Sequence, residues 1–226
     1  MLKFYISILF FFSCLASNAQ ISKNAVLVGG QLSSNLIFAK DDSSNAFKNR
    51  GIGFILSLGK ALRQNTLFGI NLGYHYSRSV SEYPADQARS TAHGYAIGPY
   101  YRKYKTLDKK ISLFGEAEFL FEISNERTDN RMANDDRDHH RTGGKFSLTP
   151  GAAYQLFKKL QIEFSIPSIL SLSYTRIKSE YENPAFNDTI QEYFFLGTRF
   201  NSYAVFNSIA FGFRFYFEKR PGESEQ

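Results

Sequence analysis

Six charged residues stand where an alternating strand would point them away from its apolar side. They are Arg102, Glu116, Glu118, Lys145, Glu163 and Arg214. Carboxylates beside arginines can form a structural ion-pair network, line a path for ions, or act as general acid and base. If the strands close into a narrow barrel, these charges share one interior and must pair. We therefore predict a lumen ion-pair network that plugs the barrel, with a gated ion path and acid/base catalysis as alternatives.

An acidic run followed by two histidines has the residue types of a divalent-metal site. It reads Asp135-Asp136-Arg137-Asp138-His139-His140. Carboxylates and imidazoles are common ligands of divalent metals. The spacing of these residues matches no usual ligand motif, however, and Arg137 interrupts the run. We expect a solvated loop and no metal site here.

Two histidines could serve in catalysis at the rim of a barrel. His75 and His93 fall on facing ends of adjacent strand-like runs, with Ser77 and Ser90 nearby. Small barrels that act on lipids place a serine or histidine at such a position. No motif in the sequence, however, combines a nucleophile, a base and an orienting acid. We therefore predict no catalytic residue, no cofactor and no enzymatic activity.

Eight strand-like runs would position these side chains. They span residues 25–38, 52–58, 67–77, 93–104, 111–123, 145–156, 160–175 and 202–217. Each alternates between an apolar face and a small or polar face, which is the period of a β-strand with unlike sides. In the last run the phenylalanines 211, 213, 215 and 217 share one face, and Gly212 and Arg214 lie on the other. We predict an all-β fold, an eight-stranded antiparallel up-and-down transmembrane barrel.

The connections between these runs alternate in length. Residues 60–65, 105–110 and 157–159 form short connections, whereas 39–50, 80–91, 124–144 and 176–201 are long and polar. Short turns at one end and long loops at the other are typical of an outer-membrane barrel with both termini in the periplasm. Because proline cannot donate to a β-ladder, Pro99, Pro150 and Pro167 predict bulges or bends.

Alternation alone does not say whether lipid or water surrounds the barrel. In a soluble, lipocalin-like barrel the apolar face would point inward. Here the polar face is rich in glycine, serine and alanine, which suit the crowded interior of an eight-stranded barrel. Aromatic residues near the strand ends would form interfacial girdles; we assign to them Tyr74, Tyr76, Tyr95, Tyr100, Tyr101, Tyr154, Tyr174, Tyr203 and Phe217. These features favour a lipid-facing apolar side.

Composition and the chain ends fit an exported protein. The chain has 226 residues, a net charge of +6 and one cysteine, Cys14. Residues 1–19 have the basic start, apolar core and small final residues of a cleaved signal peptide, with the cut after Ala19. We place the barrel in residues 20–217 and a disordered periplasmic tail in 218–226. No basic stripe with interleaved aromatics indicates nucleic-acid binding.

Five short segments occur in an order that is typical of one known family. They are residues 28–32 (VGGQL), 97–104 (IGPYYRKY), 113–116 (LFGE), 149–154 (TPGAAY) and 211–217 (FGFRFYF). Together they resemble the bacterial outer-membrane β-barrel domain family of small eight-stranded, porin-like proteins. The resemblance implies insertion into the outer membrane of a Gram-negative cell through the C-terminal strand, and it implies no common activity.

From these patterns we expect a non-enzymatic outer-membrane barrel. Its role would be structural, porin-like, or surface binding through long extracellular loops. The expected partners are outer-membrane lipids, lipopolysaccharide and the barrel-assembly machinery during insertion, and we expect a monomer. The alternatives are a lipid-modifying enzyme of the lipid A deacylase or acyltransferase type and a soluble, lipocalin-like carrier.

Overall fold

The computed structural model describes residues 21–40, 46–83, 86–130, 136–166, 168–181, 187–198 and 210–217. The predicted signal peptide, the predicted tail, Pro167 and Tyr203 lie outside these residues. The strands are β1 (Val26–Lys40), β2 (Ala46–Arg63), β3 (Thr66–Tyr83), β4 (Asp86–Thr106), β5 (Ile111–Asn130), β6 (Arg137–Phe157), β7 (Leu160–Ser165), β8 (Leu170–Tyr181), β9 (Thr189–Thr198) and β10 (Ala210–Phe217). The described residues contain no helix long and apolar enough to span a membrane.

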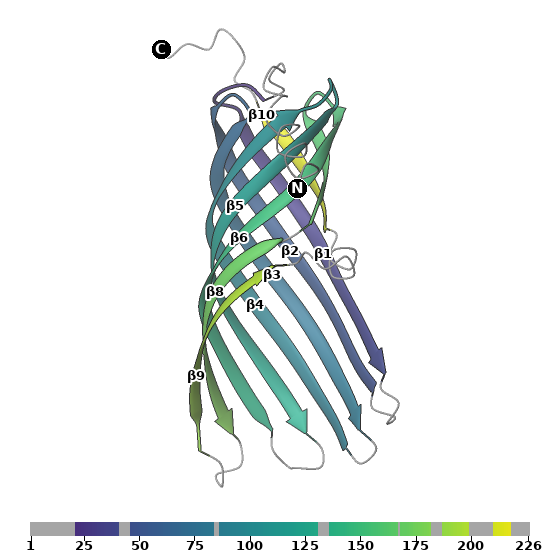
Figure 1. The fold of residues 1–226 in the computed structure, drawn as a ribbon, viewed down its shortest axis with the longest axis vertical. Coiled ribbons are helices and arrows are strands. Elements are labelled where there is room, and N and C mark those ends of the chain that lie inside the picture. Colours follow the sequence, from purple (N-terminus) through teal and green to yellow (C-terminus); the bar gives the residue numbers. More distant parts are fainter. Residues whose placement is uncertain are drawn as a thin grey trace, which may run out of the picture.

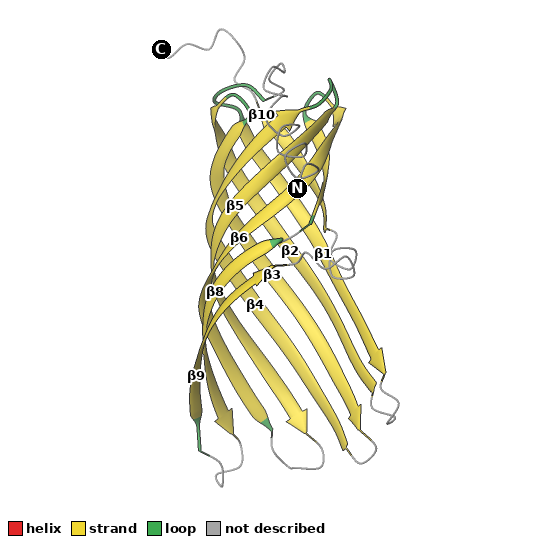
Figure 2. Cartoon of the chain, in the orientation of Figure 1, coloured by secondary structure: helices red, strands yellow, loops and turns green. Residues whose placement is uncertain are grey.

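Eight of these strands close into a ring. Neighbours in sequence pair antiparallel from β1 to β7, then β7 pairs with β10 and β10 pairs with β1. Val26 at the start of β1 lies opposite Phe217 at the end of β10, so the barrel begins and finishes at the same end. The strands run obliquely around a long cylinder (Figures 1 and 2). The predicted eight-stranded antiparallel barrel is confirmed.

The structure has ten strands because each of the last two strand positions in the barrel is divided between two strands, β7 with β8 and β9 with β10. Both β7 and β8 pair with β6, β7 with residues 151–157 and β8 with 137–148. The strand is interrupted between β7 and β8. There Ser168 has a φ of 55°, and its N–H donates to the Thr149 hydroxyl at 3.1 Å. We predicted a bend at Pro167; the structure shows an interruption of the strand in this region, and Pro167 itself lies outside the described residues. Beyond the interruption, β9 pairs with β8.

The two ends of the barrel differ, and we name them by their connections. At the turn end, residues 64–65, 107–110 and 158–159 join strands, as the sequence predicted. Asn65 has a φ of 57°, a left-handed conformation that asparagine tolerates in a tight hairpin. The opposite end is the loop end, at the bottom of Figure 1.

The prediction of long loops at the loop end is wrong in extent. Most of residues 80–91 and 124–144 belong to the hairpins β3–β4 and β5–β6, which continue as strands. The whole of β9 also lies in the predicted loop 176–201. Strands that leave the hydrocarbon have water on their outer side, so their side chains lose the apolar–polar alternation. Without that period, strand and loop look alike in the sequence.

The face assignment is confirmed. Phe211 is 56 % exposed on the outer face of β10, whereas the neighbouring lumen residue Arg214 is 3 % exposed. The apolar residues of the predicted outer faces are exposed on the other strands as well, among them Ile52, Phe54, Leu58, Phe68, Ile70, Ile97, Leu113, Phe119 and Phe121. A soluble barrel would bury this face, so the soluble-carrier alternative does not fit the structure.

Proline 99 locally interrupts the ladder, as predicted. On one side it pairs with Ile70 of β3. On the other side the ladder with β5 passes from Ile97–Phe121 to Tyr100–Glu118, and the two residues between, Gly98 and Pro99, form no ladder pair with β5. Because proline lacks an N–H, the missing pairs fall where a donor would be needed. The barrel therefore tolerates this proline at a local irregularity.

Candidate functional site

Four charged side chains meet inside the turn half of the barrel. Arg102 comes from β4, Glu116 from β5, Glu163 from β7 and Arg214 from β10, and each is at most 6 % exposed. Arg102 Nε lies 2.7 Å from a carboxylate oxygen of Glu116, and its Nη1 lies 2.8 and 2.7 Å from the two oxygens of Glu163. Arg214 Nε donates to Glu163 at 2.8 Å. We call these four residues the lumen cluster; its formal charges sum to zero.

Aromatic side chains complete the hydrogen bonding of the lumen cluster. The Tyr104 hydroxyl donates to Glu163 at 2.8 Å, and Tyr100 accepts from Arg214 at 3.3 Å. The guanidinium carbon of Arg102 lies 4.1 Å from the centre of the Phe114 ring, within range of a cation–π contact. Arg102, Glu163 and Arg214 thus each have an opposite charge and a further partner, which a buried ion pair needs to offset its desolvation. Glu116 contacts the two arginines.

Glycines on the lumen wall make room for these large side chains. A Cβ on Gly69 would stand 2.7 Å from Tyr100 Cε1, and one on Gly59 would meet the Tyr100 hydroxyl. A Cβ on Gly151 would stand 2.6 Å from Phe114 Cε1. The glycine-rich inner face that the sequence showed is therefore the space that the filling of the lumen occupies.

The other two residues of the predicted network lie apart from the lumen cluster. Glu118 accepts hydrogen bonds from Asn71 at 3.0 Å and from Ser147 at 2.8 Å, and Ser57 donates to Asn71 at 2.7 Å. Lys145 is half-buried, and no ion pair joins it to another described residue. The structure thus brings four of the six predicted residues together and places Glu118 among uncharged hydrogen-bond donors.

A layer of apolar residues lies on the turn-end side of the lumen cluster. It includes Ile21, Leu27, Ala61, Leu67 and Tyr216, each at most 5 % exposed. Ile21 precedes β1 and exchanges backbone and side-chain hydrogen bonds with Asn65 in the β2–β3 turn. The sequence analysis missed this layer and also Tyr100, Tyr104 and Phe114. Tyr100, Tyr104 and Phe114 share the strand parity of Arg102 and Glu116, which is the signal that could have found them.

Toward the loop end the interior becomes more accessible. On β5 the inward residues Glu116, Glu118 and Leu120 are buried, whereas Glu122, Ser124 and Glu126 are half-buried. The structure therefore describes a lumen that is filled in its turn half and open in its loop half. Such an arrangement obstructs a solute path from end to end.

The other candidates for chemistry, apart from Asp135, which lies outside the described residues, are spread over both faces of the wall. His139 faces inward and bonds Ser179, whereas His140 faces outward and bonds Asn125, so the two adjacent histidines point to opposite sides of β6. In the part of the chain that the structure describes, no group of three or more acidic, histidine or cysteine side chains could hold a metal. From Arg137 on, the predicted loop is strand β6.

His75 and His93 are also separated by the barrel wall. His93 is exposed on the outer face, where its Nδ1 lies 3.1 Å from the Tyr74 hydroxyl. His75 points into the lumen, and its ring covers the position where a Cβ of Gly94 would stand. The two histidines do lie on facing ends of adjacent strands, as predicted, but their side chains point to opposite sides of the wall because they differ in strand parity.

The pattern of this wall matches a known family over almost its full length. The model of the outer membrane protein beta-barrel domain matches residues 6–217. The chain belongs to this outer-membrane β-barrel family. The exposed apolar face therefore contacts the lipid of a bacterial outer membrane.

Solved structures similar to this outer-membrane barrel are remote in sequence. The attachment invasion locus protein Ail of Yersinia pestis is 13 % identical, covers 87 % of this chain and 100 % of its own, and has a TM-score of 0.36. The outer membrane protease OmpT from Escherichia coli is 8 % identical, covers 90 % of this chain and 97 % of its own, and has a TM-score of 0.41. No curated protein matches the chain.

The outer face of the barrel shows where the membrane ends. On β5 the outward residues are apolar from Ile111 to Ile123 and then become Asn125, Arg127 and Asp129. The twelve residue-to-residue steps from Ile111 to Ile123, at about 3.4 Å each and tilted by roughly 45°, rise about 29 Å, close to the ~25 Å apolar band of such barrels. Beyond this band Lys178 and Glu180 pair at 2.5 Å, and the Lys178 ammonium holds the pKa of the Glu180 carboxyl below its usual value.

Among the predicted girdle residues that the structure describes, which exclude Tyr203, all but one lie on the outer face. Tyr101, Tyr154 and Phe217 are exposed toward the turn end, and Tyr74, Tyr95 and Tyr174 toward the loop end. Tyr100 is instead 1 % exposed, because it points into the lumen and binds Arg214. Its assignment to a girdle is wrong, since it has the parity of the inner face.

Proposed function

We propose that this outer-membrane barrel is a non-enzymatic, non-conducting protein that binds partners at the cell surface. The loop end faces outward and both termini lie in the periplasm. The observation that carries the proposal is the Arg102–Glu163 pair, which joins two strands that β5 and β6 separate in the ring. A lumen crossed by a buried ion pair leaves no continuous path for a hydrated solute.

The protruding hairpins support the second half of the proposal. From Ile123, the last apolar residue on the outer face, β5 continues to Asn130, and this length of strand extends roughly 20 Å. Its outer face is polar, and β6 pairs with it as far as Arg137. A paired sheet that leaves the bilayer presents a rigid polar surface, which is suited to recognition of a partner. A protein that served only as a membrane anchor would not need such a surface.

Conductance in planar bilayers tests the closed lumen. The purified barrel, inserted at a density at which a general porin gives clear steps, is expected to show no large, steady channel. A stable conductance of porin size would refute the closed lumen.

The mass of lipid A tests the absence of enzyme activity. Lipid A from cells with and without the gene should have the same mass distribution, whereas a lost or gained acyl chain would support a lipid-modifying enzyme.

Labelling of intact cells tests the orientation and the display. A cysteine in place of Arg127 is expected to react with a reagent that does not cross the outer membrane. Photo-cross-linkers at the same position should capture a partner on whole cells, and a linker at the turn-end residue Leu107, which lies on the opposite end, serves as the matched control. Labelling at Leu107 and not at position 127 would reverse the orientation.

A further inference from the structure

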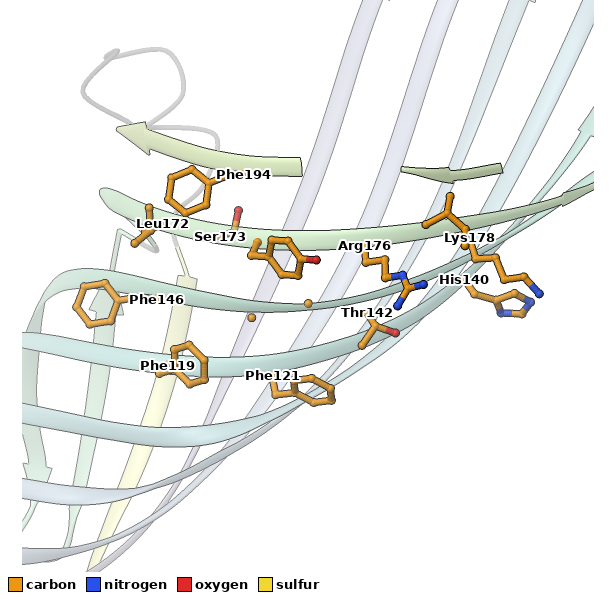
Figure 3. A pocket seen from close by; sticks show the side chains of 14 residues that line it. Phe119, Phe121, His140, Thr142, Phe146, Leu172, Ser173, Arg176, Lys178 and Phe194 are labelled. Atoms are coloured by element: carbon orange, nitrogen blue, oxygen red, sulfur yellow. The ribbon is translucent and has the colours of Figure 1, made fainter. Parts of the chain in front are cut away.

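A groove runs over the outer face of the barrel across β5, β6, β8 and β9. Its volume is about 780 Å³. The residues that line it are Phe119, Phe121, His140, Thr142, Gly143, Gly144, Phe146, Leu172, Ser173, Tyr174, Arg176, Lys178, Ile190 and Phe194. In Figure 3 the side chains of Phe119, Phe146, Leu172 and Arg176 belong to the outer face of the wall, whereas Ser173 points the other way and has the parity of the inner face. The groove is therefore open to the membrane and separate from the lumen cluster.

The groove changes character along its length. Phe119, Phe146, Leu172 and Phe194 gather at one end (Figure 3), within the apolar band of the barrel. His140, Arg176 and Lys178 gather at the other end, nearer the loop end of the strands. The lining contains two basic side chains and no carboxylate. This gradient complements an amphiphile with apolar chains and an anionic head.

Two adjacent glycines form the floor of the groove. Gly144 faces outward, and a Cβ there would stand 3.1 Å from Phe119 Cζ. A larger side chain would fill the space between Phe121 on β5 and Tyr174 on β8, the two residues that lie opposite Gly144 in the register. The hollow in the wall thus depends on the absence of a side chain at this position.

The two cations differ in how far their neighbours neutralise them. Lys178 Nζ lies 2.5 Å from Glu180, a direct ion pair. Arg176 Nε lies 4.0 Å from Glu192, too far for a direct hydrogen bond. A guanidinium has five N–H donors in a planar fork, which matches the oxygens of a phosphate. Arg176 is therefore the principal candidate for contact with an anionic head group.

We infer that this groove binds a phosphorylated, multi-acyl lipid of the outer leaflet, of the lipid A type. The acyl chains lie along the phenylalanine end, and a phosphate contacts Arg176 with Lys178 beside it. A zwitterionic phospholipid fits less well, because its ammonium group would meet the same cations. The inference rests on the proposed orientation, since the basic end is then at the level of the outer head groups.

Native mass spectrometry of the full-length mature barrel in non-ionic detergent tests the inference. The probes are bis-phosphorylated lipid A and the same lipid A after enzymatic dephosphorylation. The parent is compared with the double variant R176Q/K178Q, with the groove-filling variant Gly144→Val, and with Arg127→Gln. Arg127 is the matched control, because it is an exposed outer-face arginine that does not line the groove. Far-UV circular dichroism verifies that each variant is folded.

Phosphorylated lipid A should bind the parent and Arg127→Gln equally and bind R176Q/K178Q roughly fivefold or more weakly, as expected for the loss of two exposed ion pairs. The affinity of the parent for dephosphorylated lipid A should be as low as the affinity of R176Q/K178Q for phosphorylated lipid A. Equal binding of both lipids, or of parent and double variant, overturns the inference. Equal loss in Arg127→Gln also overturns it, since attraction would then be general.

Failure of this inference and failure of the proposed function are distinguishable. Binding in micelles does not depend on how the barrel is inserted in a cell. A reversed labelling pattern at residues 107 and 127 would therefore reject the orientation and leave the micelle result intact. Conversely, loss of phosphate dependence rejects the lipid site and leaves the closed lumen and surface display unchanged.

Discussion

Arg102 on β4 reaches across the barrel to Glu163 on β7, where its Nη1 contacts both carboxylate oxygens at 2.8 and 2.7 Å. Both side chains are buried, at 1 % and 6 % exposure. A pair that crosses the lumen holds distant strands at a fixed separation, which neighbouring backbone ladders alone do not do. The ion pair therefore both closes the lumen and braces the ring.

Replacing Glu163 by glutamine should destabilise the barrel. The change keeps the shape of the side chain but leaves Arg102 and Arg214 with a single carboxylate, Glu116, between them. Stranding a buried charge costs about 3–5 kcal/mol. Urea unfolding in detergent, followed by circular dichroism because the chain has no tryptophan, measures the loss.

Glu180→Gln is the control for that prediction. Glu180 pairs with Lys178 on the exposed outer surface, so its loss should cost at most about 1 kcal/mol. Replacing Arg102 and Glu163 together by methionine should cost less than the two single changes added, since no charge is stranded. Equal midpoints for Glu163→Gln and the parent would show that the cluster carries no stability.

A methyl group on Gly59 should clash with Tyr100. Gly59→Ala places a Cβ against the Tyr100 hydroxyl and 3.2 Å from Cζ of the same ring. Overpacking of this kind costs about 1–3 kcal/mol. In a Tyr100→Phe background the hydroxyl is gone, so the same alanine should cost less. A double-mutant cycle measures this coupling, and strictly additive effects would mean that the two residues do not compete for space.

Spin labels along β5 should locate the membrane boundary. A nitroxide at Phe121 is expected to be accessible to oxygen, whereas one at Arg127 is expected to be accessible to a water-soluble nickel chelate, because the outer face turns polar after Ile123. Labels at Phe213 and Gly212 of β10 should report lipid and lumen, respectively. Bulk-water accessibility at Phe213 would invert the assignment of the two faces.

Ile21 should contribute to stability although it precedes the first strand. It is 1 % exposed in the apolar layer on the turn-end side of the lumen cluster. Truncating a buried isoleucine to alanine costs about 2–5 kcal/mol. Unfolding of Ile21→Ala should show this loss, with the exposed turn residue Leu107→Ala as a near-neutral control. The intact mass of the mature protein tests whether it starts at Gln20, one residue before.

The strands of the barrel wall could be predicted from the sequence because their two faces have different surroundings. Wherever lipid lies outside and side chains fill the inside, the period of two survives, as in Phe211, Phe213 and Phe215 against Gly212 and Arg214. The eight runs, the short turns and the break near Ser168 follow from that period and from the positions of proline.

Only the tertiary structure decided which polar residues meet. Glu116 and Glu118 share a face and are two residues apart. Glu116 nevertheless joins the lumen cluster, whereas Glu118 accepts hydrogen bonds from Asn71 and Ser147. Parity gives the face of a residue, but its height and its partners across the lumen depend on the strand register and on closure of the ring. The hairpins beyond Ile123 escaped prediction for the related reason that water on their outer side removes the alternation on which the sequence argument depends.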